Sequence, residues 1–89
     1  MVDLAATETS LRGLLEALGT TLTDSERNEV MHFLDVGEYG VALETLCAII
    51  EEEGKVIASE TYLQIEAIGH RMAMDPATWT RIRPIQSRE

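Results

Sequence analysis

Residues 23–54, which read TDSERNEVMHFLDVGEYGVALETLCAIIEEEG, contain two helical patterns of apolar residues separated by a glycine. In the first pattern the apolar residues recur three and four positions apart, as on one face of an α-helix: Val30, Phe33 and Leu34. The second pattern carries a similar stripe, formed by Tyr39, Leu43, Leu46 and Ile50. Gly37 predicts the end of the first helix and Gly54 the end of the second, because glycine favours the position just after a helix. The stretch therefore predicts two helices that meet at a short corner.

The residues before this stretch predict another helix, over residues 3–18. Its apolar stripe consists of Leu11, Leu14, Leu15 and Leu18. Gly19 is placed to end it. The next helix then starts at a capping box, in which the side chains of Thr23 and Glu26 each bind the free backbone N–H group of the other residue.

Two more helix starts follow the stretch. Ser59 is a suitable cap for a fourth helix, which presents at helical spacing the apolar residues Ile65, Ile68 and Met72. After it, Asp75 is a favourable cap and Pro76 suits the first position of a helix. We therefore expect a short fifth helix that ends by Pro84.

Length and composition fit one domain. The chain has 89 residues, of which 45% are hydrophobic, as in ordinary globular proteins. No segment alternates polar and apolar residues for long enough to predict a strand. We expect an all-α fold, a compact bundle of four helices plus a short C-terminal helix, with residues 1–89 forming a single helical domain.

Acidic residues dominate the charge of the chain. It has 7 basic and 16 acidic residues and a net charge of −9. Residues 1–66 alone hold 14 acidic and 3 basic residues, a net charge of −11. Such a charge repels the phosphates of nucleic acids and anionic lipids, so direct binding to nucleic acid or membrane is disfavoured. It attracts basic partners, although acidity also keeps a small protein soluble without any partner.

The cysteine count and the start of the chain bear on its location. Cys47 is the only cysteine, so an intramolecular disulfide is excluded and an oxidising compartment is not indicated. Residues 1–4 lack the basic start of a signal peptide, and no apolar run reaches the roughly 20 residues that span a bilayer. We expect a cytoplasmic protein.

The reactive side chains form no catalytic or metal-binding pattern. His32 and His70 lie on different predicted helices, and no HExxH or CxxC spacing is present. Cys47 falls on the inner side of its predicted helix, where a thiol acts as a small apolar side chain. Residues 37–40 contain two glycines but lack the lysine and hydroxyl residue of a phosphate loop. We expect no metal, no cofactor and no enzymatic activity.

The corner between the two central helices resembles a segment of a known family. Residues 33–47, FLDVGEYGVALETLC, resemble the signature segment of the MafI family of bacterial immunity proteins. The resemblance continues through the acidic residues 51–53 and a helix over 62–72. It ends with Met74-Asp75-Pro76 ahead of Trp79.

This resemblance implies a function. Members of the family stay in the producing cell and neutralise the C-terminal domain of a secreted polymorphic toxin, often a nuclease. By this resemblance the chain is the cognate immunity protein, a monomer that forms a 1:1 complex with a basic toxin domain. The acidic composition agrees with it, because a nuclease needs a basic surface to hold phosphates and an acidic protein can cover that surface.

We expect the partner to bind at the corner and along the third helix. The expected contact residues are Asp35, Glu38, Tyr39, Glu44, Glu51, Glu52 and Glu53. Tyr39 would be an aromatic anchor, although its place on the apolar stripe fits core packing equally well. Glu44 could instead cap or pair within the domain. Acids at a helix C-terminus oppose the helix dipole by about 0.3–1 kcal/mol each, so residues 51–53 give up stability unless they serve another purpose; the alternative is a simple solvated surface.

Two other classes of protein remain alternatives. One is a non-enzymatic acidic helical adaptor or assembly subunit. The other is an acyl or peptidyl carrier protein, which is also small, acidic and helical. Carriers present their modified serine within Asp-Ser-Leu at the start of the second helix, whereas this chain has Asp24-Ser25-Glu26 there.

Overall fold

The computed structural model describes residues 3–82, and these contain four α-helices and two 3-10 turns but no β-strand. The helices are α1 (Leu4–Leu18), α2 (Asp24–Asp35), α3 (Tyr39–Glu52) and α4 (Ser59–Arg71). The turns are η1 (Gly19–Thr21), directly after α1, and η2 (Pro76–Thr78), after α4. The predicted all-α fold is confirmed.

Local signals set the ends of the central helices. The predicted capping box opens α2: the Thr23 hydroxyl accepts from the Glu26 N–H at 3.1 Å, and the Glu26 carboxylate accepts from the Thr23 N–H at 2.9 Å. Beyond α2 and α3 the chain reverses at Gly37 and Gly54, whose φ angles of 79° and 61° lie in the left-handed region. Glycine adopts this region without steric strain, which is why both helices end there.

The start of α4 differs from the prediction by one residue. Ser59 is the first helical residue, and Ala58 occupies the cap position without a side-chain hydrogen bond. Ile57 is buried directly before the helix. This buried side chain anchors the chain directly before α4.

The predicted fifth helix is a single 3-10 turn, η2. Its start was predicted correctly, because the Asp75 carboxylate accepts from the Ala77 N–H at 3.0 Å. Its length was not. At Trp79 the chain leaves helical geometry, with φ −122°, and the indole is completely buried. Pro84, the latest predicted end, itself lies outside the described residues.

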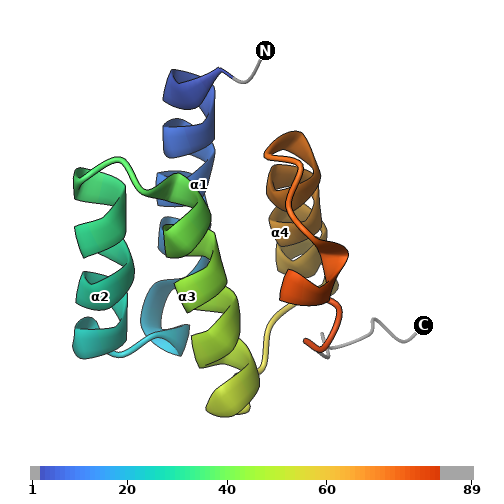
Figure 1. Ribbon diagram of the computed structural model, residues 1–89. Coiled ribbons are helices and arrows are strands. Elements are labelled where there is room, and N and C mark those ends of the chain that lie inside the picture. Colours follow the sequence, from blue (N-terminus) through green and yellow to red (C-terminus); the bar gives the residue numbers. More distant parts are fainter. Residues whose placement is uncertain (1–2, 83–89) are drawn as a thin grey trace.

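The four helices pack in two pairs. α2 packs mainly against α3 and α1 mainly against α4, while α1 also contacts α2 and α3 (Figure 1). The start of α1, the corner between α2 and α3 and the end of α4 lie at the upper end of the view in Figure 1. The end of α3 and the start of α4 lie at the lower end. Segments distant in sequence therefore meet at each end of the bundle.

The core is built from the predicted stripes together with one late tryptophan. The fully buried residues of the predicted stripes are Leu11, Leu14, Val30, Leu34, Leu43, Leu46, Ile50 and Ile65. Phe33 is half-buried and packs against this core. Trp79 packs so closely on α4 that a Cβ added at Gly69 would lie 2.2 Å from a ring carbon. The segment after α4 is therefore fastened to that helix by its indole.

Candidate protein-interaction surface

The expected contact residues lie along α3 instead of forming one cluster. Asp35 and Glu38 precede the helix, Tyr39 is its first residue, and residues 51–53 stand at its end. A helix of 14 residues is about 20 Å long at 1.5 Å per residue. The structure therefore separates six of the seven expected residues into two groups, and Glu44 lies between these groups. We name them the corner end of α3 (35–40) and the acidic end of α3 (51–53).

At the corner end, charged side chains join three helices. Arg12 of α1 contacts Glu8, one turn earlier, at 2.8 Å and Asp35 of α2 at 3.1 Å. The Tyr39 hydroxyl donates to the other oxygen of the Glu8 carboxylate at 3.0 Å. Hydrogen bonds from Arg12 and then Tyr39 lower the pKa of Glu8, and the same carboxylate raises the pKa of Tyr39. This network holds the first residue of α3 against α1.

The position of Tyr39 is compatible with both expected roles. The side chain is half-buried and packs against the core, as its place on the apolar stripe predicted. Its hydroxyl is bound by Glu8, yet Tyr39 also lines an open hollow at the corner. Glu38 occupies the cap position of α3, where its side chain makes no capping hydrogen bond and is exposed.

The corner hollow was not predicted from the sequence. It has a volume of about 340 Å³ and is lined by Leu4, Gly37, Glu38, Tyr39, Gly40, Met72 and Met74. The lining comes from the start of α1, the corner, and the chain after α4, which are far apart in sequence. Leu4 is 59% exposed there although it is large and apolar.

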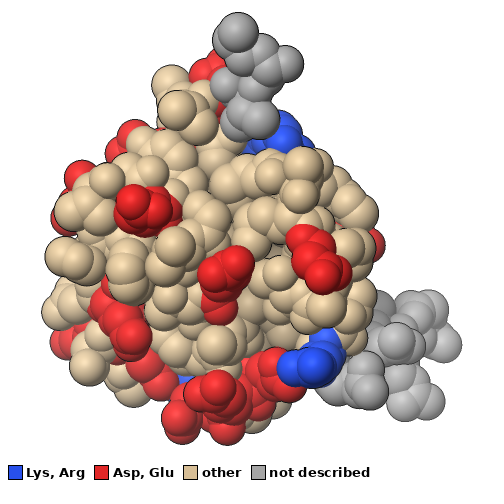
Figure 2. Space-filling model, viewed as in Figure 1, with Lys and Arg blue, Asp and Glu red and all other residues tan. Residues whose placement is uncertain are grey.

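At the acidic end, three carboxylates in succession face solvent. Glu51, Glu52 and Glu53 are all exposed. Within residues 3–82, Glu51 forms one ion pair, with Arg81, whose Nη1 lies 3.9 Å from its carboxylate, and the other two form no ion pair. Figure 2 shows acidic side chains gathered over the lower end of the molecule and scattered across its front, with few basic ones between them. The acidic end is thus a concentrated negative surface.

The only lysine of the chain does not neutralise this surface. Lys55 follows α3 closely in sequence, but its ammonium contacts the Glu26 carboxylate at 2.9 Å. The Thr23 backbone N–H first, and Lys55 second, lower the pKa of Glu26. The lysine is therefore engaged with the start of α2 instead of with residues 51–53.

In the middle of α3, an acidic residue lies on the exposed side of the helix and the cysteine lies on the buried side. Glu44 is exposed beside Val41, which is also partly exposed. Cys47 is 2% exposed, and burial, with the nearby charges of Glu44 and Glu51, raises the pKa of its thiol to about 12. The predicted core role of Cys47 is confirmed.

Metal-ligating groups do not converge in the part of the chain that the structure describes. No cluster of three or more His, Cys, Asp or Glu side chains suited to a metal ion occurs between residues 3 and 82. The two histidines lie on different helices, and each packs edge-on against an aromatic ring. The ring centroids are 5.3 Å apart for His32 and Phe33 and 5.2 Å apart for His70 and Trp79. Over the same range, every helix is too short or too polar to cross a bilayer.

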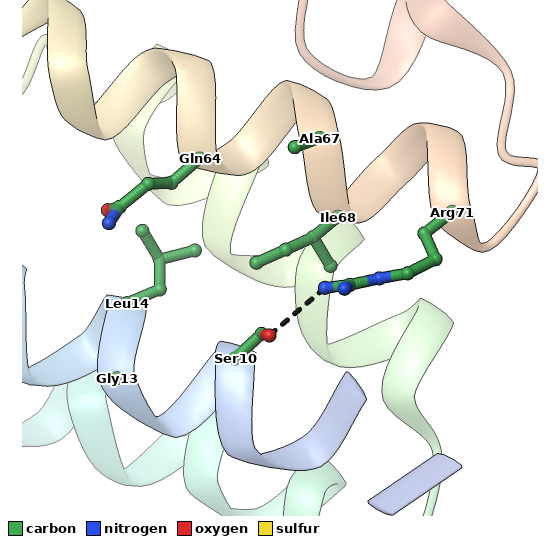
Figure 3. A pocket seen from close by; sticks show the side chains of 7 residues that line it. All are labelled: Ser10, Gly13, Leu14, Gln64, Ala67, Ile68 and Arg71. Carbon is green, nitrogen blue, oxygen red and sulfur yellow. Dashed lines mark hydrogen bonds between the residues drawn. The ribbon is translucent and has the colours of Figure 1, made fainter. Parts of the chain in front are cut away.

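A second hollow lies between α1 and α4, away from the expected contact residues. Figure 3 shows Leu14 and Ile68 between the two helices and Arg71 reaching from α4 to Ser10 of α1. The Arg71 guanidinium donates to the Ser10 hydroxyl at 3.0 Å. This groove is bordered by Gly13 and carries a cation instead of acids.

Comparisons with protein-family models, curated proteins and solved structures give no match for this chain. The resemblance of residues 33–47 to the MafI segment therefore stays a prediction. In the structure, α2 and α3 form a helix–corner–helix unit. Both ends of α3 carry charge, and the corner end also borders an apolar hollow.

Proposed function

We propose that this protein is an immunity protein that binds and neutralises the C-terminal toxin domain of a secreted polymorphic toxin. The observation that carries the proposal is the exposed acidic surface along α3, on a chain of net charge −9. In this proposal the protein acts in the cytoplasm of the producing cell and has no enzymatic activity of its own.

The placement of the acids supports binding to a basic protein. The acidic end opposes the dipole of α3, since the last turn of that helix carries no basic residue and is followed by Glu53. An exposed negative surface accelerates association with a basic partner, and this effect weakens as salt is added. A toxin that binds nucleic acid offers such a basic surface.

The corner end could supply the packed apolar contact from which an interface draws most of its binding energy. Interfaces draw most of their binding energy from a few well-packed anchors, while charges at the rim mainly change the association rate. Tyr39, held by Glu8 and bordering the hollow, is placed to be such an anchor. Asp35 and Glu38 stand exposed beside it.

The test is rescue of growth. Cells express the C-terminal domain of the protein encoded directly upstream, with and without this chain, and the two proteins are then co-purified. We expect growth to be restored and a 1:1 complex to be recovered. Absence of both rescue and complex would contradict immunity and favour an adaptor or assembly subunit.

A charge-matched pair of variants connects rescue to α3. Glu52→Gln/Glu53→Gln removes two charges from the acidic end, whereas Glu16→Gln/Glu29→Gln removes two exposed charges from α1 and α2. We expect the first pair to slow complex formation and the second to leave it close to wild type. Equal behaviour of the two pairs would mean that net charge, and not α3, governs binding.

A further inference from the structure

The corner hollow is open because its rim contains glycines. Gly37 and Gly40 contribute no side chains to it, and a Cβ added at either position would meet nothing within 4 Å. Its volume of about 340 Å³ falls at the lower edge of the range of about 300–1,000 Å³ typical of pockets that bind ligands. A complete side chain can therefore enter the space between the start of α1 and the chain after α4.

The lining of the hollow favours an apolar occupant. Leu4, Tyr39, Met72 and Met74 are four of the five side chains that line it. Methionine is flexible and polarisable, so two methionines let the wall adjust to the shape of a bound group. Leu4 is exposed by more than half, and an apolar side chain seated on it would remove that surface from water.

The rim of the hollow favours a cation beside that apolar group. Glu38 lines the hollow and is exposed. Glu8 binds the hydroxyl of Tyr39, which also lines the hollow, and shares the single positive charge of Arg12 with Asp35. The four charged groups together carry a net charge of −2, so a basic residue at the rim would be attracted.

From this combination we propose that the corner hollow receives an apolar side chain of the partner, carried on a segment with an adjacent lysine or arginine. The proposal rests on the proposed function, because the partner is the basic toxin domain. The groove between α1 and α4 does not fit this occupant, since Arg71 at its edge would repel a basic segment. That groove therefore serves as the control site.

Two helical glycines give a matched test. Gly40 lines the corner hollow and Gly13 lines the α1–α4 groove, and at both positions an added Cβ meets nothing within 4 Å. Leucine is a better helix former than glycine, so Gly40→Leu and Gly13→Leu should fold at least as stably as wild type. The affinity of each variant for the upstream-encoded C-terminal domain is measured by calorimetry, together with its melting temperature.

We expect Gly40→Leu to weaken binding by about tenfold or more, because leucine fills the hollow, and Gly13→Leu to bind as wild type does. A second pair guards against a folding defect at residue 40. Leu4 and Leu63 are both 59% exposed, so Leu4→Gln and Leu63→Gln remove equally exposed apolar side chains. Of these, Leu4→Gln should weaken binding and Leu63→Gln should not.

The outcomes separate the two proposals. Wild-type affinity in both Gly40→Leu and Leu4→Gln would overturn the corner hollow as a contact while leaving immunity intact. Equal weakening within either matched pair would also overturn it, because the control site should be silent. Failure of the wild-type chain to bind the toxin domain would instead overturn the proposed function, and the assigned occupant with it.

Discussion

The two ends of α3 carry similar charge in different surroundings. At the corner end, Glu38 lies beside an apolar hollow, and Glu8, Arg12 and Asp35 bind one another and Tyr39 across three helices. At the acidic end, three carboxylates stand exposed, and among residues 3–82 the one ion pair they form is that of Glu51 with Arg81. For the proposed complex we therefore infer a division of labour, in which one end would provide an apolar contact and the other a long-range field.

Loss of the segment that reaches both ends should have the largest effect. Met72 and Met74 line the corner hollow, Arg81 lies beside Glu51, and Trp79 fastens the chain between them to α4. We expect Trp79→Ala to lower the free energy of unfolding by about 3–5 kcal/mol. Urea denaturation followed by circular dichroism would measure this change.

The same variant should also remove the difference between the two ends of α3, because the corner end loses the methionines that line its hollow and the acidic end loses the neighbouring Arg81. A decrease below about 1 kcal/mol would show that the chain after α4 contributes little to the fold. Gly69→Ala provides a related check, since its methyl group must displace the indole and should destabilise the protein by about 1–3 kcal/mol.

Removing charge from the acidic end should change binding kinetics more than the fold. In Glu52→Gln/Glu53→Gln we expect the association rate with the toxin domain to fall by about three- to tenfold at low salt, with little change in the dissociation rate. Stability should rise by about 0.3–1 kcal/mol per charge, because the helix dipole is no longer opposed. Stopped-flow measurements at several salt concentrations would test this. A change confined to the dissociation rate would contradict the division of labour.

The smallest expected effect concerns acid stability and compares the two ends directly. The pKa of Glu8 at the corner end is lowered by Arg12 and Tyr39, and that of Glu26 by Thr23 and then Lys55, which follows α3. A carboxyl with a lowered folded-state pKa stabilises the fold above its unfolded value of 4.5, and this contribution disappears as the pH falls through the folded-state pKa. We therefore expect stability to decline as the pH drops below about 4.5.

Conservative variants assign this decline to one end or the other. Glu8→Gln and Glu26→Gln should each make stability less dependent on pH below about 4.5, and glutamine at position 26 can still complete the capping box. Denaturation curves between neutral and acidic pH would measure the effect. An unchanged acid dependence in both variants would mean that other carboxylates control it.

The parts of the fold that the sequence predicted depend on residues close together in the chain. Helix starts at Thr23 and Asp75 were found because a cap and its N–H partner are two or three residues apart. The leucine stripe of α1 follows from helical periodicity. The short last helix, expected to end by Pro84, is a single 3-10 turn, and the chain leaves helical geometry at the buried Trp79.

The corner end was predicted only in part, for the opposite reason. Asp35, Glu38 and Tyr39 were identified from the segment itself, but their neighbours come from elsewhere in the chain. Tyr39 binds Glu8, 31 residues away, and Asp35 binds Arg12, 23 residues away. No local pattern shows which residues such contacts join, so neither the network nor the hollow could be predicted from one sequence.

The reactivity of the single thiol of the chain measures how often α3 detaches from the core. Cys47 lies in the middle of α3, 2% exposed and with a pKa of about 12, so it is unreactive toward alkylating reagents while the helix is packed. Each alkylation event therefore requires that α3 leave the core first. The rate of alkylation at Cys47, followed by the increase in mass, therefore measures how often the helix detaches. Comparing this rate with and without the partner shows how strongly a bound partner prevents detachment.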